Sequence, residues 1–306
     1  MELVLHIGVH RTGTTALQHL LQAHQALLAR RRVSFWGPAI LRLDGPQRYW
    51  RDCRAGAGDH MATARAADTR ATFHQEIVYE QENDRRLVVV SEENFLGTIE
   101  ANFAEHRLYP AARERLETYA TLFPEPPARV YVAVRDYGDY WSSAQALQLR
   151  FRAGLPFDSD KLVAGSAARG WPEVLADVAA ALPHSRIRTW RYTGRSGMVR
   201  GALADMIGRR LARWLPDAKI ANVSLSVAAL EELGRRRAAG EVSSDAELAA
   251  AVAELREEGG PKLRLFSDTQ RAALSELFDK EWQLIAGGGI PRVEAFDPEA
   301  HFAVTP

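Results

Sequence analysis

The sequence is short of the features that mark several large classes of protein. It has one cysteine, Cys53, which excludes an intrachain disulfide and a zinc site built from several cysteines. Basic and acidic residues number 39 each, so no net charge draws in nucleic acid or an anionic membrane. No apolar run is long enough to span a bilayer, and no signal segment opens the chain. We therefore expect a cytoplasmic protein with no membrane span and no nucleic-acid partner.

What is present is the composition of a folded globular protein, with 46% hydrophobic and 25% charged residues. Apolar runs typical of buried strands alternate with runs of helical periodicity. The expected strands are 3–7, 33–36, 87–91, 129–134 and 187–192. The expected helices between them are 16–28, 62–82, 110–122, 140–152 and 173–182. This alternation predicts a three-layer α/β fold with a mostly parallel central sheet flanked by helices.

The last third of the chain has helical periodicity only, at 198–214, 227–238, 245–257 and 267–285. We expect one domain over 1–306, with 193–306 as a mainly helical layer or, alternatively, a helical subdomain. The range 44–59 is rich in glycine and turn residues, which predicts a mobile loop near the site. Arg30, Arg31 and Arg32 are interpreted as the basic end of a helix rather than a nucleic-acid patch.

The segment GVHRTGTT, Gly8 to Thr15, lies between the first expected strand and the first expected helix. It keeps the glycine spacing of the phosphate-binding motif G-x-x-x-x-G-K-[ST], but Thr14 replaces the lysine that reaches the β and γ phosphates. Its basic residue is Arg11, on the crest of the loop. The segment predicts a P-loop-like site for a nucleotide without β and γ phosphates. The alternative is a plain turn whose threonines cap the helix.

Two further strand ends carry polar groups. One is Ser91-Glu92-Glu93, and the other is Arg135, followed by serines at 142 and 143. Because ligands bind at the carboxyl ends of parallel strands, we expect one composite site. Arg135 and Ser143 have the chemistry to hold a second phosphate, since the planar guanidinium makes paired hydrogen bonds to phosphate oxygens.

Because it has both the glycine loop at 8–15 and the segment with Arg135 and Ser143, the chain resembles the sulfotransferases that use 3'-phosphoadenosine 5'-phosphosulfate (PAPS). LHIGVHRTGTTALQ is similar to their 5'-phosphosulfate loop, and VAVRDYGDYWSSA is similar to their 3'-phosphate motif. The polar run Asn222 to Ser226 is similar to one in bacterial members. The resemblance spans roughly residues 1 to 230. It implies PAPS as co-substrate, no metal, and a small-molecule, carbohydrate or lipid-type acceptor.

The resemblance also implies roles for individual residues. The nucleotide would be held by Gly8, Arg11, Thr12, Gly13, Thr14, Thr15, Arg135 and Ser143. Family members usually have lysine in place of Arg11 and proline in place of Tyr137. Arg11 would stabilise the charge on the leaving phosphate oxygen, and His10 beside it could supply a proton.

The sequence offers two sets of candidates for the general base that accepts the proton of the acceptor hydroxyl. Glu92 and Glu93 follow a strand end, with one of them expected to face the site, and His60 follows the glycine-rich range. The alternative for each is a helix cap or a solvated side chain.

Five aromatic residues are candidates for stacking on adenine or a sugar, with core packing as the alternative: Trp36, Tyr49, Trp50, Tyr137 and Trp141. Trp190 and Tyr192 are expected in the core. Two other functions stay open, a small-molecule kinase and a non-catalytic nucleotide-binding protein.

Overall fold

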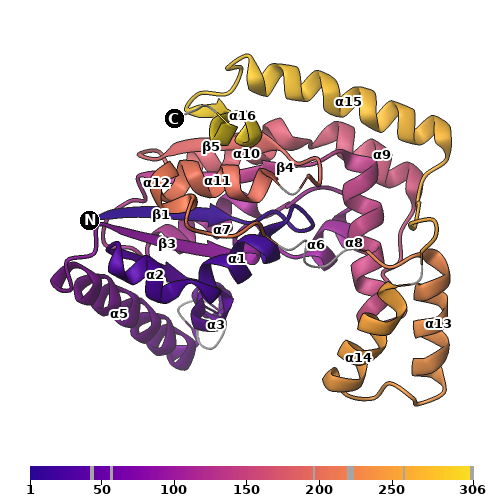
Figure 1. Ribbon diagram of the computed structural model, residues 1–306, viewed down its shortest axis with the longest axis horizontal. Helices are drawn as coiled ribbons and strands as arrows, with labels where there is room; N and C mark the ends of the chain where they lie inside the picture. The colour runs from indigo at the N-terminus through magenta and orange to yellow at the C-terminus, as the bar shows by residue number, and fades with distance from the viewer. Residues whose placement is uncertain (42–44, 56–57, 196, 219–223, 258, 304–306) are drawn as a thin grey trace.

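The structure, a computed structural model, describes residues 1–41, 45–55, 58–195, 197–218, 224–257 and 259–303. It is a three-layer α/β fold around a six-stranded, all-parallel sheet, as the alternating pattern predicts (Figure 1). The strand order is β2-β3-β1-β4-β5-β6. The strands are β1 (Glu2–Ile7), β2 (Val33–Trp36), β3 (Leu87–Glu92), β4 (Arg129–Val134), β5 (Arg186–Arg191) and β6 (Val293–Ala295).

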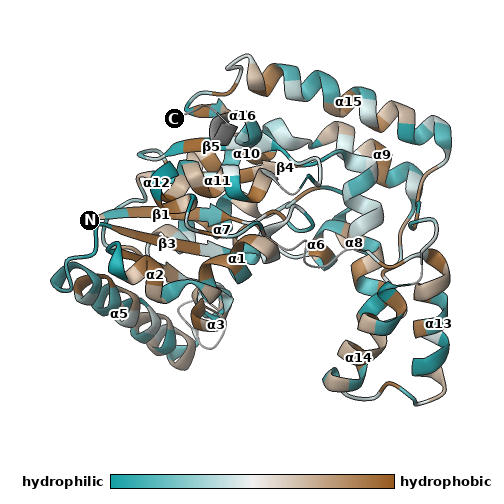
Figure 2. Ribbon diagram, in the orientation of Figure 1, coloured by the Kyte–Doolittle hydropathy of each residue, from teal (hydrophilic) through white to brown (hydrophobic). Residues whose placement is uncertain are grey.

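The central strands are apolar on both sides because helices cover both faces of the sheet. Neighbouring side chains point to opposite faces, so Leu5 and Val4 enter different hydrophobic clusters. The strands of the sheet are mostly brown in Figure 2, whereas the outer helices α5 and α15 mix brown and teal. Ile7 of β1 pairs with Glu92 of β3, so the loops after these two strands leave the sheet at the same level.

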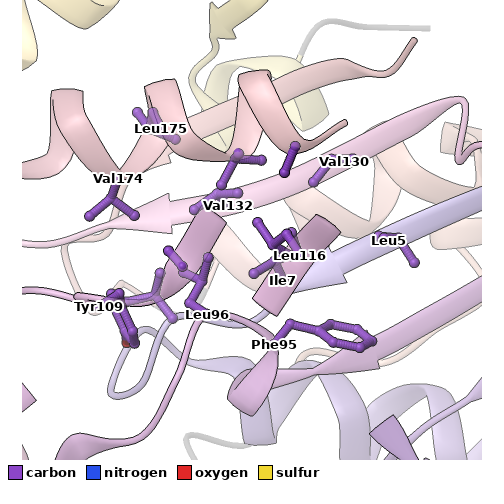
Figure 3. Close-up of a cluster of buried hydrophobic side chains, with 14 of the residues drawn as sticks. Leu5, Ile7, Phe95, Leu96, Tyr109, Leu116, Val130, Val132, Val174 and Leu175 are labelled. Atoms are coloured by element: carbon purple, nitrogen blue, oxygen red, sulfur yellow. The ribbon is translucent and has the colours of Figure 1, made fainter. Parts of the chain in front are cut away.

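One face of the sheet is covered by α1 (Thr14–Ala23), α2 (Gln25–Arg30), α11 (Gly197–Ile207) and α12 (Arg209–Ala212). The larger cluster lies on the other face, where Leu116 of α7 and Leu175 of α10 approach the strand residues (Figure 3). The helices that contribute to it are α4 (Pro46–Arg54), α5 (His60–Glu82), α6 (Ile99–Glu105), α7 (Ala112–Ala120), α8 (Tyr137–Phe151), α9 (Ser159–Ala168), α10 (Trp171–Ala181) and α15 (Asp268–Ala286). Two short elements, α3 (Pro38–Leu41) and η1 (Glu93–Phe95), also contribute to the larger cluster, whereas α16 (Pro298–Ala303) packs on α11.

The range 193–306 contributes to every layer. Its helices α11 and α12 cover one face, α15 covers the other, and β6 extends the sheet beside β5. Only α13 (Val227–Ala238) and α14 (Asp245–Arg256) project away from the sheet, with a small core of their own against α8 (Figure 1). Strand β6 is missing from the sequence prediction, because three residues are too few for a detectable alternation.

Three predicted elements need correction. The helix expected over 16–28 is two helices, α1 and α2, which meet at His24. The helix expected over 198–214 is also two helices, α11 and α12, which are separated by Gly208. The loop expected over 44–59 contains α4, which begins after Gly45 with a proline in its first turn. That helix is held by Tyr49 and Trp50, which are buried in the main core. Residues 44, 56 and 57 of this range lie outside the described chain. Within the described ranges, every helix is too short or too polar to cross a lipid bilayer.

Candidate functional site

A pocket of about 400 Å³ lies at the carboxyl ends of the strands, where ligands bind in open parallel sheets. Five parts of the chain line it. They are the loop after β1, Glu93 after β3, Arg135 with one face of α8, the residues after β5, and the two ends of the α13–α14 hairpin. Asp139, Ser143 and Leu147 come from α8 at intervals of four, so they form one row along the helix.

The loop after β1 is fixed by its own hydrogen bonds. The hydroxyls of Thr12 and Thr14 donate to the carbonyl of Val9, at 2.7 and 3.3 Å. Gly8 is required at the start of the turn, since a Cβ there would lie 2.3 Å from Cγ2 of Thr14. Thr12 is buried behind the loop, away from the pocket, and Gly8 does not line the pocket either. These two predicted ligands therefore shape the loop rather than contact the pocket.

Gly13 adopts a left-handed backbone conformation, with φ of 82°, and precedes the first residue of α1. Gly13, Thr14 and Thr15 line the pocket wall. The start of a ten-residue helix thus faces the pocket, and the helix dipole and the backbone N–H groups at this end favour an anion. The anion site expected from the glycine spacing has the strand-loop-helix geometry that it needs.

Arg11 extends across the pocket from the crest of the loop. Its Nε donates to Oγ of Ser143 at 2.8 Å, and its Nη2 donates to Oγ of Ser224 at 2.9 Å. Burial, reinforced by Arg135 and Arg150, lowers the pKa of Arg11 to about 10, so it stays charged at neutral pH. Its backbone has φ of 67°, a left-handed conformation that costs a non-glycine residue free energy and is frequent at functional sites.

Arg135 lies beside Arg11 and is half-buried. Its Nη1 donates to the carbonyl oxygen of Arg11 at 2.5 Å, and its guanidinium lies 5.5 Å from the centre of the Tyr192 ring. Burial lowers the pKa of Arg135 although Asp139 opposes the shift. Two half-buried guanidinium groups in one pocket repel each other, and an anion bound between them would reduce that repulsion.

Ser143, expected to act with Arg135, lies in the same pocket but bonds to Arg11 and to Ser224. The hairpin end after α14 adds Lys262, whose Nζ donates to the carbonyl of Ser224 at 2.7 Å. Ser224 belongs to the polar run noted in the sequence, whereas Asn222 and Val223 lie outside the described residues. Lys262 is a pocket cation that the sequence did not single out.

The two glutamates after β3 have different environments. Glu92 is fully buried, and its carboxylate accepts hydrogen bonds from the backbone and the side chain of Asn94 at 3.0 and 2.6 Å. It caps η1, the alternative role noted for it, and does not line the pocket. Glu93 is half-buried and lines the pocket. Glu93, rather than Glu92, is therefore the carboxylate placed to act on a ligand.

His10 lines the pocket as part of a buried hydrogen-bond chain. Its backbone N–H and its Nδ1 lie 3.1 and 3.0 Å from the hydroxyl of Tyr109, which also receives the hydroxyl of Tyr140 at 3.3 Å. Burial lowers the pKa of His10, although the charge of Glu93 acts in the other direction. A neutral imidazole at pH 7 carries no extra proton, so the site does not favour the predicted role of His10 as a proton donor.

His60 is separate from the other predicted site residues. It is the exposed first residue of α5, follows the capping residue Asp59, and does not line the pocket. The loop that was expected to bring it close is the helix α4.

The aromatic residues also differ from expectation. The five proposed for stacking are buried in the main core and do not line the pocket: Trp36, Tyr49, Trp50, Tyr137 and Trp141. Tyr192, expected in the core, lines the pocket instead. Tyr137 is held by Glu281 and by the backbone N–H of Trp171. Tyr192 directly follows β5, just as Arg135 directly follows β4. Its place at a strand end could therefore have identified Tyr192 as a pocket residue.

Comparison with family models, with curated proteins and with solved structures finds no match for this chain. Within the described chain, no three histidine, cysteine or acidic side chains gather in the way that a metal ion requires. The pocket geometry suits an anion, because three cations and the start of a helix line it together with two acidic groups, Glu93 and Asp139.

Proposed function

We propose that this chain is a sulfotransferase that moves a sulfuryl group from PAPS to an acceptor hydroxyl or amine. The observation that carries the proposal is the convergence of Arg11, Arg135 and the start of α1 on one pocket. The loop that contributes Arg11 has Thr14 where a nucleoside triphosphate site would have lysine. The resemblance of both motifs to the PAPS-dependent family supports the same conclusion.

In this proposal the 5'-phosphosulfate lies against Gly13, Thr14 and Thr15, and the 3'-phosphate lies against Arg135 and Ser143. Ligand binding replaces the hydrogen bonds that Arg11 makes to Ser143 and Ser224, so Arg11 is released to contact the phosphosulfate. These serines then become donors for the nucleotide. The same bonds therefore hold Arg11 in place before the ligand arrives.

The reaction is an in-line transfer. The acceptor oxygen attacks sulfur while the bond between sulfur and the bridging phosphate oxygen breaks, which leaves adenosine 3',5'-bisphosphate and a sulfated acceptor. Negative charge develops on the bridging oxygen, where the Arg11 guanidinium and the helix start stabilise it. The acceptor proton passes to Glu93, the half-buried carboxylate in the pocket. The acceptor is a small molecule, a carbohydrate or a lipid-type compound.

Thermal unfolding separates this function from the kinase alternative. A ligand at about 100 times its dissociation constant stabilises a protein by about 2.7 kcal/mol. Adenosine 3',5'-bisphosphate should raise the unfolding temperature through the pocket, whereas any rise with ATP and magnesium should not depend on Arg135. Arg135→Ala should remove the bisphosphate effect. Arg191→Ala is the matched control, because Arg191 pairs with Asp279 outside the pocket. A rise with ATP and magnesium that Arg135→Ala removes, together with no rise for the bisphosphate, would refute the assignment.

Arg11→Ala distinguishes an enzyme from a non-catalytic binding protein. The variant should keep much of the bisphosphate effect and lose transfer of radioactive sulfate from labelled PAPS to a panel of hydroxyl acceptors. If the wild-type chain binds the bisphosphate but transfers nothing to any acceptor, the non-catalytic alternative gains support. Equal transfer by wild type and variant would contradict the role of Arg11.

Variants of Glu92 and Glu93 form a matched pair that tests which glutamate is the general base. General-base catalysis contributes about 10²- to 10⁴-fold, so Glu93→Gln should reduce kcat by at least 100-fold with little change in unfolding temperature. Glu92→Gln disturbs the buried cap of η1 and should lower the unfolding temperature while it retains most of kcat. A large kcat loss in Glu92→Gln and none in Glu93→Gln would reverse the assignment.

A further inference from the structure

A second concentration of positive charge lies at the opposite end of the sheet. Five arginines and one tryptophan line a hollow of about 860 Å³: Arg31, Arg86, Arg209, Arg210, Arg213 and Trp214. They come from the turn before β2, the residue before β3, and α12 with the two residues after it. The hollow is therefore at the amino ends of strands, about 20 Å from the pocket at their carboxyl ends, given six-residue strands and about 3.3 Å per residue.

Backbone contacts fix the shape of this arginine hollow. Nε of Arg86 donates to the carbonyl of Arg31 at 3.1 Å, and its Nη2 donates to the carbonyl of Ile207 at 3.2 Å. Arg86 thus connects the turn before β2 to the end of α11. Ile207 and Leu211 are buried beneath the hollow, so its floor belongs to the core on this face of the sheet.

The charges of the hollow are not balanced from within. Arg31, Arg210 and Arg213 are exposed and form no ion pair in the part of the chain that the structure describes. No acidic side chain is among the described residues that line the hollow. The neighbouring Arg32, in contrast, pairs with Asp84. Several guanidinium groups facing one space favour a ligand with several negative charges.

Trp214 adds a flat apolar surface to this group of charges. It is 67% exposed, which is unusual for the largest apolar side chain. Arginine forks that bind phosphate, together with an aromatic ring on which a base can stack, are the combination used for nucleotides and single strands. A volume of about 860 Å³ falls within the range of roughly 300–1,000 Å³ for sites of small ligands.

We propose that the arginine hollow binds a nucleotide with several phosphates, either free or as part of a single strand. The phosphates contact the arginines, and the base stacks on Trp214. The zero net charge of the chain does not oppose this proposal, because the attraction comes from a local group of charges. The site is independent of the transfer pocket and does not rest on the function proposed for it.

The test uses the whole chain, and Arg135→Ala shows whether the probe binds in the transfer pocket instead of the hollow. Fluorescence anisotropy follows the binding of a labelled ten-nucleotide single strand of adenosine, and unlabelled ATP without metal competes. Arg210→Glu with Arg213→Glu should weaken binding at least about tenfold, and added salt should weaken binding of the wild type. Trp214→Ala should weaken it about tenfold, as expected for the loss of one stacked base. Thermal unfolding checks that each variant folds.

A charge-matched control is Arg51→Glu with Arg70→Glu, two exposed arginines on α4 and α5, which should leave binding unchanged. Competition by ATP identifies a free nucleotide as ligand, whereas binding of the strand without such competition identifies a single strand. The proposal is overturned if Arg135→Ala weakens binding of the probe as much as the hollow variants do, or if neither probe binds. It is also overturned if the control pair weakens binding as much as the hollow variants do. Tripolyphosphate that competes as well as ATP, with no effect of Trp214→Ala, would equally exclude a nucleotide.

Discussion

At the residue scale, the buried histidines His6 and His10 make the fold sensitive to acid. Nδ1 of His6 lies 2.8 Å from the hydroxyl of Ser91, and its ring stacks on Trp190 with centroids 6.3 Å apart. Burial lowers the pKa of His6 to about 4 and also lowers the pKa of His10. Both rings are therefore neutral when folded at neutral pH, whereas they gain a proton near pH 6.5 when unfolded.

The sign of the pH dependence follows from these shifts. Between about pH 6.5 and 4 these two histidines bind more protons in the unfolded chain than in the folded chain, so their contribution to the free energy of unfolding decreases as the pH falls. His6 accounts for a loss on the order of 3 kcal/mol across this range. Urea unfolding at several pH values should show that His6→Asn has a shallower acid slope than wild type.

His19, exposed on α1, provides the control for His6. His19→Asn should keep the wild-type slope. Burial raises the pKa of Glu281 to about 7, so protonation of Glu281 stabilises the folded chain as the pH falls. The test therefore compares the acid slopes of His6→Asn, His19→Asn and wild type with one another. Identical slopes for wild type and His6→Asn would show that His6 is not the group responsible.

At the element scale, two helical glycines differ only in their surroundings. Gly234 lies in α13, where an added Cβ would have nothing within 4 Å. Gly165 lies in α9, where an added Cβ would come 1.7 Å from the carbonyl oxygen of His106. Helix propensity favours alanine at both positions, and sterics permit it at one.

Gly234→Ala should therefore stabilise the protein by about 0.5–1 kcal/mol through helix propensity. Gly165→Ala should destabilise it by about 1–3 kcal/mol or more, because α9 must move away from the chain at His106. Chemical denaturation of both variants measures the two free energies. A destabilised Gly234→Ala would show that α13 has a neighbour at this position.

The elements also show where sequence patterns succeed. Strands β2 and β4 and helix α13 have the predicted limits, because alternation, capping residues and apolar periodicity agree there. Helix α4 was missed because Gly45 and Pro46 stand at the start of a helix of nine residues, whose formation depends on Trp50 packing against Tyr119 and Arg115. Those partners lie more than 60 positions away, so no local window contains them.

At the scale of the whole molecule, the α13–α14 hairpin and the sheet have separate cores. Leu233 is fully buried in the hairpin cluster, and Leu175 is fully buried in the main cluster under the sheet (Figure 3). The hairpin cluster is small, and among the described residues Ala146 of α8 is its one buried member from outside the hairpin segments. We expect the hairpin to open without unfolding of the sheet.

Leu175→Ala should destabilise the whole protein by about 2–5 kcal/mol, as large-to-small changes do in well-packed cores. Leu233→Ala should instead accelerate hydrogen exchange in α13 and α14 and leave exchange in the strands unchanged. Mass spectrometry of exchanged peptides measures both effects. Faster exchange throughout the sheet in Leu233→Ala would show that the two clusters unfold together.

The sequence by itself determined the α/β alternation and the loop between β1 and α1, because apolar periodicity and glycine spacing act over short distances. It also placed Arg135 and Ser143 near that loop, since parallel strands end at one edge of a sheet. The tertiary structure decided that Glu93 rather than Glu92 lines the pocket, and that Lys262 reaches it from a distant hairpin. It also joined Arg31 to arginines almost 180 positions away. Those outcomes depend on strand order and on the direction of single side chains, which are set by contacts between segments that no local pattern records.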